Sequence, residues 1–304
     1  MPRLFDAYIV VDWSAAAKPA TGANSIWVGI LARDARLQFR FTSVNPKTRL
    51  EARAFVGDMA EKLIARGDKV LIGVDFALGY PSGTAAAAGL PKGDMAPWQA
   101  MQTYLAQKVR EKSDNSNARF ALAAGLNYAI SKGPHPFWGV PKRDAVSTLS
   151  PTKGDFAARG SLPEHRSCER WINSQYKASP KSVWQLLGAG AVGSQALLGI
   201  PAVREWRERL ERSRIWPFET GFGELTAEAL SDVSCVFAEV YPSTIEAVPD
   251  GDEVLDVAQV RGLAQHLQTL DSAGKLAACF GPPSTLKPSE IAQIEMEEGW
   301  ILAK

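Results

Sequence analysis

The chain contains 304 residues, of which 46% are hydrophobic and 22% are charged, enough apolar material to bury a substantial core. Its 34 basic and 33 acidic side chains give a formal net charge of +1, so the protein as a whole exerts no long-range attraction on polyanions. The composition therefore excludes a disordered chain and argues against a protein that coats nucleic acid.

The cysteines and the apolar stretches predict a cytoplasmic protein. Cys168, Cys235 and Cys279 are far apart and odd in number, so they favour neither a disulfide framework nor a zinc site. The apolar run 7–11 is too short for a signal peptide. The uncharged stretch 183–203 is long enough to cross a bilayer, but its four glycines favour a buried helical segment and no membrane span.

Three short strands are predicted at the start of the chain, at 7–13, 25–31 and 36–42, with Gly/Ala/Pro-rich and Arg-Asp turns between them. The last of these, RLQFRFT, alternates polar and apolar residues, as a strand with one solvated face does. Such closely spaced strands favour an antiparallel meander.

A helix and a buried strand follow the meander. Residues 49–66 place apolar side chains at helical spacing, with charges on the other side and Gly67 as a C-cap. The run 69–76, KVLIGVDF, is almost wholly apolar and belongs in the middle of a sheet that is covered on both faces. Since parallel neighbours need a crossover connection, the helix is well placed to supply one.

The composition changes over the long segment 83–231, which is rich in alanine and interrupted by proline and glycine residues. Within it, the pattern suggests a strand only at 214–219. We interpret this segment as a mostly helical insertion. A strand returns at 234–241, SCVFAEVY, and helices are predicted at 257–270 and 272–279.

This order of elements corresponds to the ribonuclease H-like plan, an α/β fold in which a three-stranded antiparallel meander continues into parallel strands. We expect a single domain over 1–304. Its parts would be the core at 1–82 and 232–283, the large mostly helical insertion at 83–231, and a C-terminal tail at 284–304.

Acidic residues end three of the predicted strands, at Asp12, Asp75 and Glu239. An unpaired acid inside a strand would be costly, so these side chains should project from the rim of the sheet, where they would converge if their strands are neighbours. Clustered carboxylates without Cys or His favour Mg²⁺ or Mn²⁺. Asp271, which would begin the last core helix, could complete this site.

Each acid also has a simpler interpretation. Asp12 could form an Asx-turn with Ser14, and Asp271 could be a helix N-cap. For any one acid this is the better interpretation, whereas three acids at the ends of neighbouring strands favour the metal site.

Five segments together resemble the DUF429 family of predicted nucleases with a ribonuclease H fold. They are DWSAA, VDFALGYP, EVYPS, KSVWQLLGAGAVGSQALLGIP and EEGWIL, and the resemblance covers nearly the whole chain. It implies a metal-dependent phosphodiesterase whose acids correspond to Asp12, Asp75 and Glu239, with Asp271 matching less closely because the surrounding LDSAGKL is sparse in acids.

Other residues are candidate substrate contacts. Ser14 and Lys18 follow the first strand, and Arg143 and Arg166 lie in the insertion, where they could hold a phosphate. The GxGxxG formed by Gly188, Gly190 and Gly193 could cradle a dinucleotide, but a lone match is weak, and we interpret it as a packing motif. His135, between two prolines in GPHPFWG, could be a general acid or a loop residue bonded to backbone.

The leading hypothesis is a nuclease-like, metal-dependent hydrolase of phosphodiester bonds, acting on nucleic acid or on a nucleotide-like small molecule. One alternative is an actin-like phosphotransferase or ATPase, although WSAAAKPATG is a poor phosphate loop. The other is a non-catalytic binding module that retains the fold.

Overall fold

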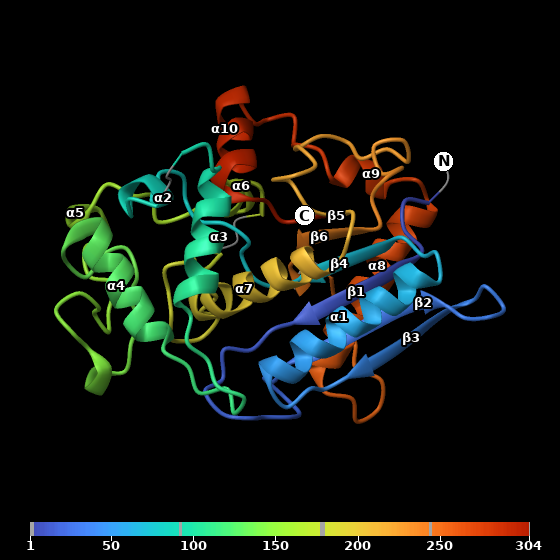
Figure 1. Cartoon of the computed structure of the whole chain (residues 1–304), viewed down its shortest axis with the longest axis horizontal. Coiled ribbons are helices and arrows are strands. Elements are labelled where there is room, and N and C mark those ends of the chain that lie inside the picture. Colours follow the sequence, from blue (N-terminus) through green and yellow to red (C-terminus); the bar gives the residue numbers. More distant parts are fainter. Residues whose placement is uncertain (1–2, 91–92, 177–179, 243–244, 304) are drawn as a thin grey trace.

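A six-stranded mixed sheet forms the centre of the protein, in the order β3-β2-β1-β4-β6-β5 (Figure 1). The computed structural model describes residues 3–90, 93–176, 180–242 and 245–303. The strands are β1 (Ala7–Asp12), β2 (Trp27–Arg33), β3 (Phe39–Val44), β4 (Val70–Val74), β5 (Ser213–Ile215) and β6 (Cys235–Glu239).

The first three strands form the predicted antiparallel meander, with β3 at the edge. The second and third begin two to three residues later than the sequence suggested, because residues that look extended also occupy the turns. β3 has no fully buried residue, as its alternating pattern indicates.

The other half of the sheet is parallel. β4 pairs with β1, and every residue of β4 is buried, as expected for an apolar strand covered on both faces. β6 pairs with β4 on its other side. β5 joins β6 at the edge, so the segment 83–231 contributes a strand to the sheet as well as helices.

Most of the helices lie in the middle and at the end of the chain, in the part that the structure describes. Their bounds are α1 (Arg49–Ala65), α2 (Thr84–Ala87), α3 (Pro97–Lys108), α4 (Arg119–Ser131), α5 (Phe156–Arg159), α6 (Ser167–Tyr176), α7 (Gly193–Arg209), α8 (Leu255–Ser272), α9 (Leu276–Cys279) and α10 (Pro288–Gln293). Short 3₁₀ and π-helical turns occur at Lys142–Asp144 and Ile294–Glu298.

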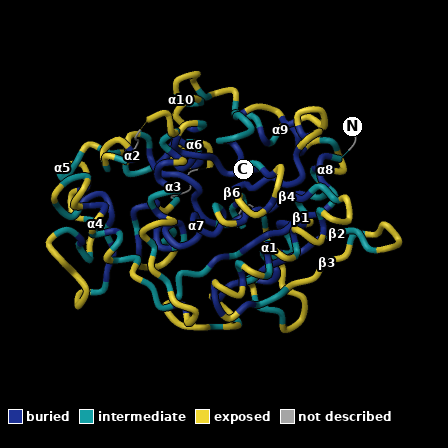
Figure 2. Tube along the Cα trace, in the orientation of Figure 1, coloured by how far each residue is buried: buried dark blue, intermediate teal, exposed yellow. Residues whose placement is uncertain are grey.

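Helices cover both faces of the sheet. Val56 of α1 and Trp206 of α7 pack with Ile9 and Val11 on one face, whereas α8 lies against the residues that alternate with these. Figure 1 shows α1 in front of the strands and α8 behind them, and Figure 2 shows the central strands buried and the edge strand β3 partly exposed.

A separate apolar cluster joins the helical segment to the sheet. Tyr80, which follows β4, stacks on Trp184 with ring centroids 5.3 Å apart, and Phe137 packs edge-on against Trp184 at 4.9 Å. The loop after β4 is therefore enclosed between the sheet and the helical segment 83–231.

Candidate functional site

Two aspartates lie together at the carboxyl ends of the neighbouring strands β1 and β4. In β1, Asp12 shares a face with Tyr8 and Val10, and Asp75, directly after β4, continues the face of Leu71. Both acids therefore project on the side covered by α8. Their carboxyl groups are close enough to interact, so the pKa of each depends on the other.

The environment of this pair favours its protonated form. Burial raises the pKa of Asp12, and the charge of Asp75 raises it further. Burial also raises the pKa of Asp75, although the backbone N–H of Trp13, 2.8 Å from its Oδ1, acts in the opposite direction by stabilising the carboxylate. Without a cation, the two acids share a proton in preference to ionising together.

A third acid, Asp256, acts on the pair from the first turn of α8. Its charge raises the pKa values of both Asp12 and Asp75, and its Oδ2 accepts a 2.6 Å hydrogen bond from the backbone N–H of Asn24. Sequence reasoning missed Asp256, although an acid at a helix start that packs on the sheet is a usable signal. Among the described residues, no group of three or more His, Cys, Asp or Glu side chains is placed to hold a metal ion.

Glu239 does not join the pair, because it lies one position out of phase. It is level with Val74 in the parallel pairing and therefore projects on the face of Cys235 and Phe237, opposite to Asp75. The three strands are neighbours as predicted, but the expected three-acid cluster is replaced by an acid pair and a separate ion-paired glutamate.

Arg166 binds Glu239 at this second position. Its Nη1 and Nη2 donate 2.7 Å hydrogen bonds to the two carboxylate oxygens, and its Nε donates a 2.9 Å bond to Glu169. All three side chains are buried. Burial alone would raise the pKa of Glu169, but Arg166 outweighs burial and lowers it, whereas burial prevails at Glu239 and raises its pKa. The oxygens of Glu239 are thus engaged by a guanidinium group.

Asp271 lies at the opposite end of β1, so the expectation that it completes a site with Asp12 is wrong. α8 runs unbroken to Ser272, which places Asp271 at its last turn and not at a helix start. Its oxygens accept hydrogen bonds from the backbone N–H groups of Leu4 and Phe5, at 2.8 and 2.9 Å, and from the Tyr8 hydroxyl at 2.6 Å. Asp271 is a buried structural acceptor.

A cavity of about 440 Å³ opens beside the two acidic positions. Asp75 and Glu239 line it from the strand ends, and Arg166 lines it from the start of α6. The segment 188–192 supplies another wall, so the glycine-rich stretch does more than pack helices. Gly193 and Gly199 do serve packing, because a Cβ atom there would lie 2.3 Å from the Val183 carbonyl oxygen and 2.4 Å from the Phe76 ring, respectively.

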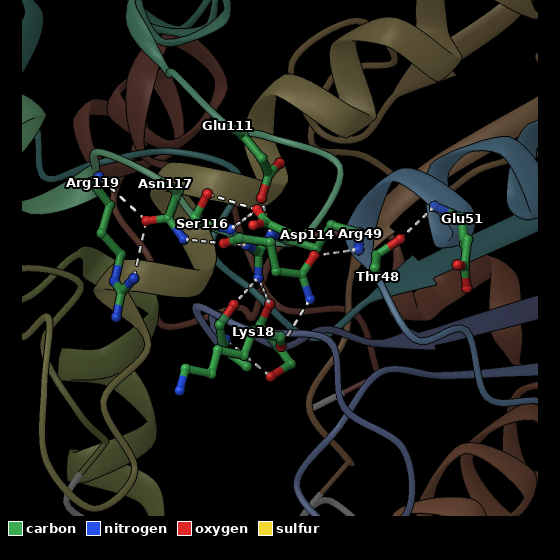
Figure 3. Close-up of polar contacts among 12 residues, drawn as sticks. Lys18, Thr48, Arg49, Glu51, Glu111, Asp114, Ser116, Asn117 and Arg119 are labelled. Carbon is green, nitrogen blue, oxygen red and sulfur yellow. Dashed lines mark hydrogen bonds and ion pairs between the residues drawn. The ribbon is translucent and has the colours of Figure 1, made fainter.

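The other predicted substrate contacts lie outside the lining of this cavity. The Ser14 carbonyl accepts a 2.7 Å bond from buried Arg49, which also binds the carbonyls of Ala16 and Asn115 and thereby anchors the loop after Asp12 (Figure 3). The Lys18 side chain is exposed and points away from this network. Arg143 is 85% exposed, beside Asp144. Both ring nitrogens of buried His135 lack a hydrogen-bond partner.

The C-terminal segment holds the cavity walls in place. The carboxylate of Glu298 accepts bonds of 2.9 and 2.6 Å from the backbone N–H groups of Ser82 and Ser167, and its carbonyl oxygen accepts a 3.0 Å bond from Arg166. Leu302 then donates a 2.8 Å backbone bond to the carbonyl of Glu239. The EEGWIL motif is therefore a clamp on the loop after β4, α6 and β6.

Comparison with known proteins gives no relative: no family model, curated protein or solved structure matches the chain. Within the described residues, no helix has the length and apolar character that crossing a membrane requires. The case for function therefore rests on the chemistry of the acid pair and the cavity.

Proposed function

We propose that the chain is a divalent-metal-dependent phosphodiester hydrolase with a ribonuclease H-like core, in which Asp12 and Asp75 bind a Mg²⁺ or Mn²⁺ ion. The antiparallel strands that continue through β1 into parallel strands support this fold assignment. The motif resemblance to the DUF429 family suggests the same fold, and no family model matches the chain.

The juxtaposition of Asp12 and Asp75 at the carboxyl ends of the adjacent parallel strands β1 and β4, with each carboxyl group acting on the other, is the observation that carries the proposal. Two carboxyl groups in contact need either a proton or a cation between them. The donors are all oxygen, and Mg²⁺ is commonly bound by one or two carboxylates, with waters and substrate phosphate oxygens completing its shell. A pair therefore suffices where a third protein ligand is absent. When bound, the ion would withdraw charge from a phosphoryl oxygen and lower the pKa of a water molecule.

The residues around the pair have supporting roles. The N–H of Trp13 fixes one oxygen of Asp75, so the orientation of that carboxylate does not depend on the ion. Asp256 adds negative charge that strengthens the preference for a cation. Hydrolysis would transfer the hydroxyl of a water molecule to phosphorus and its proton to the leaving oxygen, and Asp75, which lines the cavity, could relay that proton.

The test is hydrolysis of bis(p-nitrophenyl) phosphate by the purified chain with Mg²⁺, with Mn²⁺ and with EDTA. We expect activity only with a divalent ion, and Asp12→Asn or Asp75→Asn should lower kcat/KM by about 100-fold or more, because each removes a ligand charge. The matched control is Asp94→Asn, which neutralises an exposed acid in a turn and should leave activity unchanged.

A melting experiment tests ion binding without a substrate. A free ion at a hundred times its Kd should stabilise the wild type by about 2.7 kcal/mol, which for a chain of this size raises Tm by roughly 5 °C. Asp75→Asn should reduce that increase. The proposal is overturned if neither ion shifts Tm beyond a monovalent salt of equal ionic strength and no phosphodiester is cleaved. ATP turnover alone would point to the phosphotransferase.

A further inference from the structure

The cavity beside Asp75 is lined by both apolar and polar residues. The apolar ones are Ile172, Pro180, Val240, Pro242 and Ile301. The polar and charged side chains are Asp75, Arg166, Glu169, Lys181, Gln195 and Glu239, and the glycine segment 188–192 adds backbone groups. A ligand that fills the cavity therefore contacts apolar surface as well as polar groups.

The positive charge that is open to a ligand in this cavity is small. Two basic side chains, Arg166 and Lys181, line it among the described residues. The guanidinium of Arg166 is already bound by Glu169 and Glu239. Lys181 is exposed, and no acid of the described residues pairs with it. One open ammonium group at the mouth suits one phosphate, whereas strand binding relies on many basic contacts along a backbone.

Backbone N–H groups add to the polar lining near Lys181. Val192 precedes α7, a 17-residue helix, and makes no side-chain cap, and the N–H of Gly193 is taken by the Gln185 carbonyl oxygen. The uncapped N–H groups of the first turn are therefore those of Ser194 and Gln195, of which Gln195 lines the cavity. Gly188 and Gly190 have φ angles of +114° and +71°, which turn the segment sharply before the helix and let it approach the ligand without side chains. These donors complement the single ammonium group of Lys181.

The size of the cavity limits what can occupy it. About 440 Å³ lies within the range of roughly 300–1,000 Å³ typical of small-molecule sites. A nucleotide-sized group fits such a volume, whereas a base inside a duplex would first have to be extruded. The overall net charge of +1 supplies no compensating attraction to a polyanion.

We propose that this cavity binds one compact phosphate ester that carries an aromatic or apolar group, of the size of a nucleotide, in preference to a nucleic-acid duplex. The phosphate lies between Asp75, Lys181 and the segment 188–192, and the apolar group lies against Ile172 and Pro242. This inference rests on the proposed hydrolase function and specifies its substrate class.

Three substrates test the inference: thymidine 5′-(p-nitrophenyl phosphate), methyl p-nitrophenyl phosphate and a 20-base-pair duplex, each with Mg²⁺ or Mn²⁺. The nucleotide ester should have the highest kcat/KM, and the methyl ester should show a KM about 10-fold higher or more, because it leaves the apolar residues uncovered. Lys181→Ala should raise KM for both esters about 10-fold with kcat little changed. Lys108→Ala, which removes an exposed charge at the end of α3, is the matched control.

Each outcome separates this inference from the proposed function. Cleavage of the duplex with a kcat/KM equal to that of the nucleotide ester, or an unchanged KM in Lys181→Ala, would overturn the inference and leave the hydrolase intact. If no substrate is cleaved, calorimetric titration of thymidine 5′-monophosphate with Mg²⁺ decides: binding that Lys181→Ala weakens supports the cavity assignment while the hydrolase fails, and absence of binding overturns both.

Discussion

The side-chain amide of Gln195 donates a 2.6 Å hydrogen bond to the backbone carbonyl oxygen of Trp13. Gln195 belongs to the first turn of α7, and Trp13 follows Asp12 and binds Asp75 through its N–H. This contact joins the glycine-rich wall of the cavity to the acid pair. The two parts of the site therefore hold a fixed relationship, although 182 residues separate them in sequence.

The acid pair should make the metal-free protein less stable as the pH rises. Burial raises the folded-state pKa values of Asp12 and Asp75 above the ordinary value of an aspartate, 3.8, so folding retains protons that the unfolded chain releases. The stabilisation is complete below pH 3.8 and is lost as the pH rises toward the folded-state values, by at most about 1.4 kcal/mol per pH unit for each acid.

Asp12→Asn should therefore flatten the dependence of stability on pH between 5 and 8, and it should unfold at higher urea than wild type at pH 8 in EDTA. Urea unfolding at several pH values measures this, with Asp94→Asn expected to follow the wild type. Parallel curves for wild type and Asp12→Asn would contradict the shared proton.

Replacement of Asp271 should affect stability and leave ion binding unchanged. The two carboxylate oxygens of Asp271 accept hydrogen bonds from Leu4, Phe5 and Tyr8, whereas an asparagine has only one acceptor oxygen. Asp271→Asn should therefore lower the free energy of unfolding by about 1–3 kcal/mol. The rise of Tm with Mg²⁺ should match that of the wild type. If the variant has the Tm of the wild type but Mg²⁺ no longer raises it, Asp271 is a ligand of the ion and the structural interpretation is wrong.

Arg166→Met should be among the most damaging single changes, because it leaves the buried carboxylates of Glu169 and Glu239 without a positively charged partner. The free energy of unfolding, measured with a chemical denaturant, should fall by about 3–5 kcal/mol. Adding Glu169→Gln and Glu239→Gln should recover a large part of this loss, since the glutamines carry no charge. If the triple variant is no more stable than Arg166→Met, the charge argument fails.

Gly199→Ala should destabilise α7 although alanine favours helices. Its Cβ would lie 2.4 Å from the Phe76 ring, next to Asp75, and overpacking of this kind costs about 1–3 kcal/mol. Gly125→Ala in α4 is the matched control, because nothing lies within 4 Å of its added Cβ, and it should stabilise by about 0.5–1 kcal/mol. Equal Tm changes for both would contradict the close contact.

Local pattern predicted the elements that have strong local signals. The apolar run that became β4 and the amphipathic helix that became α1 were confirmed within a few residues, and so was the adjacency of β1, β4 and β6. These features depend on periodicity and on the short crossover between neighbouring strands, both of which are visible in the sequence.

The site was only partly predictable, since it depends on strand register and on contacts between distant segments. Glu239 pairs with Val74, one residue before Asp75, so the side chains of Glu239 and Asp75 project from opposite faces of the sheet. No local motif predicts which residue of β6 pairs with which residue of β4. The pairing of Arg166 with Glu239 spans 73 residues. The position of Asp271 differs from the prediction because the sequence pattern indicates a new helix from Ser272, whereas α8 runs unbroken to that residue.

The clamp formed by Glu297 and Glu298 also has a consequence for hydrogen exchange. Glu297 accepts 2.7 Å bonds from the backbone N–H groups of Gly83 and Ala85, and Glu298 accepts those of Ser82 and Ser167. Because these four amides depend on two adjacent side chains, one local opening exposes all of them together. Their deuterium uptake should therefore follow a common rate, and Glu298→Gln should accelerate exchange at Gly83 and Ala85, which Glu298 does not contact, as well as at Ser82 and Ser167.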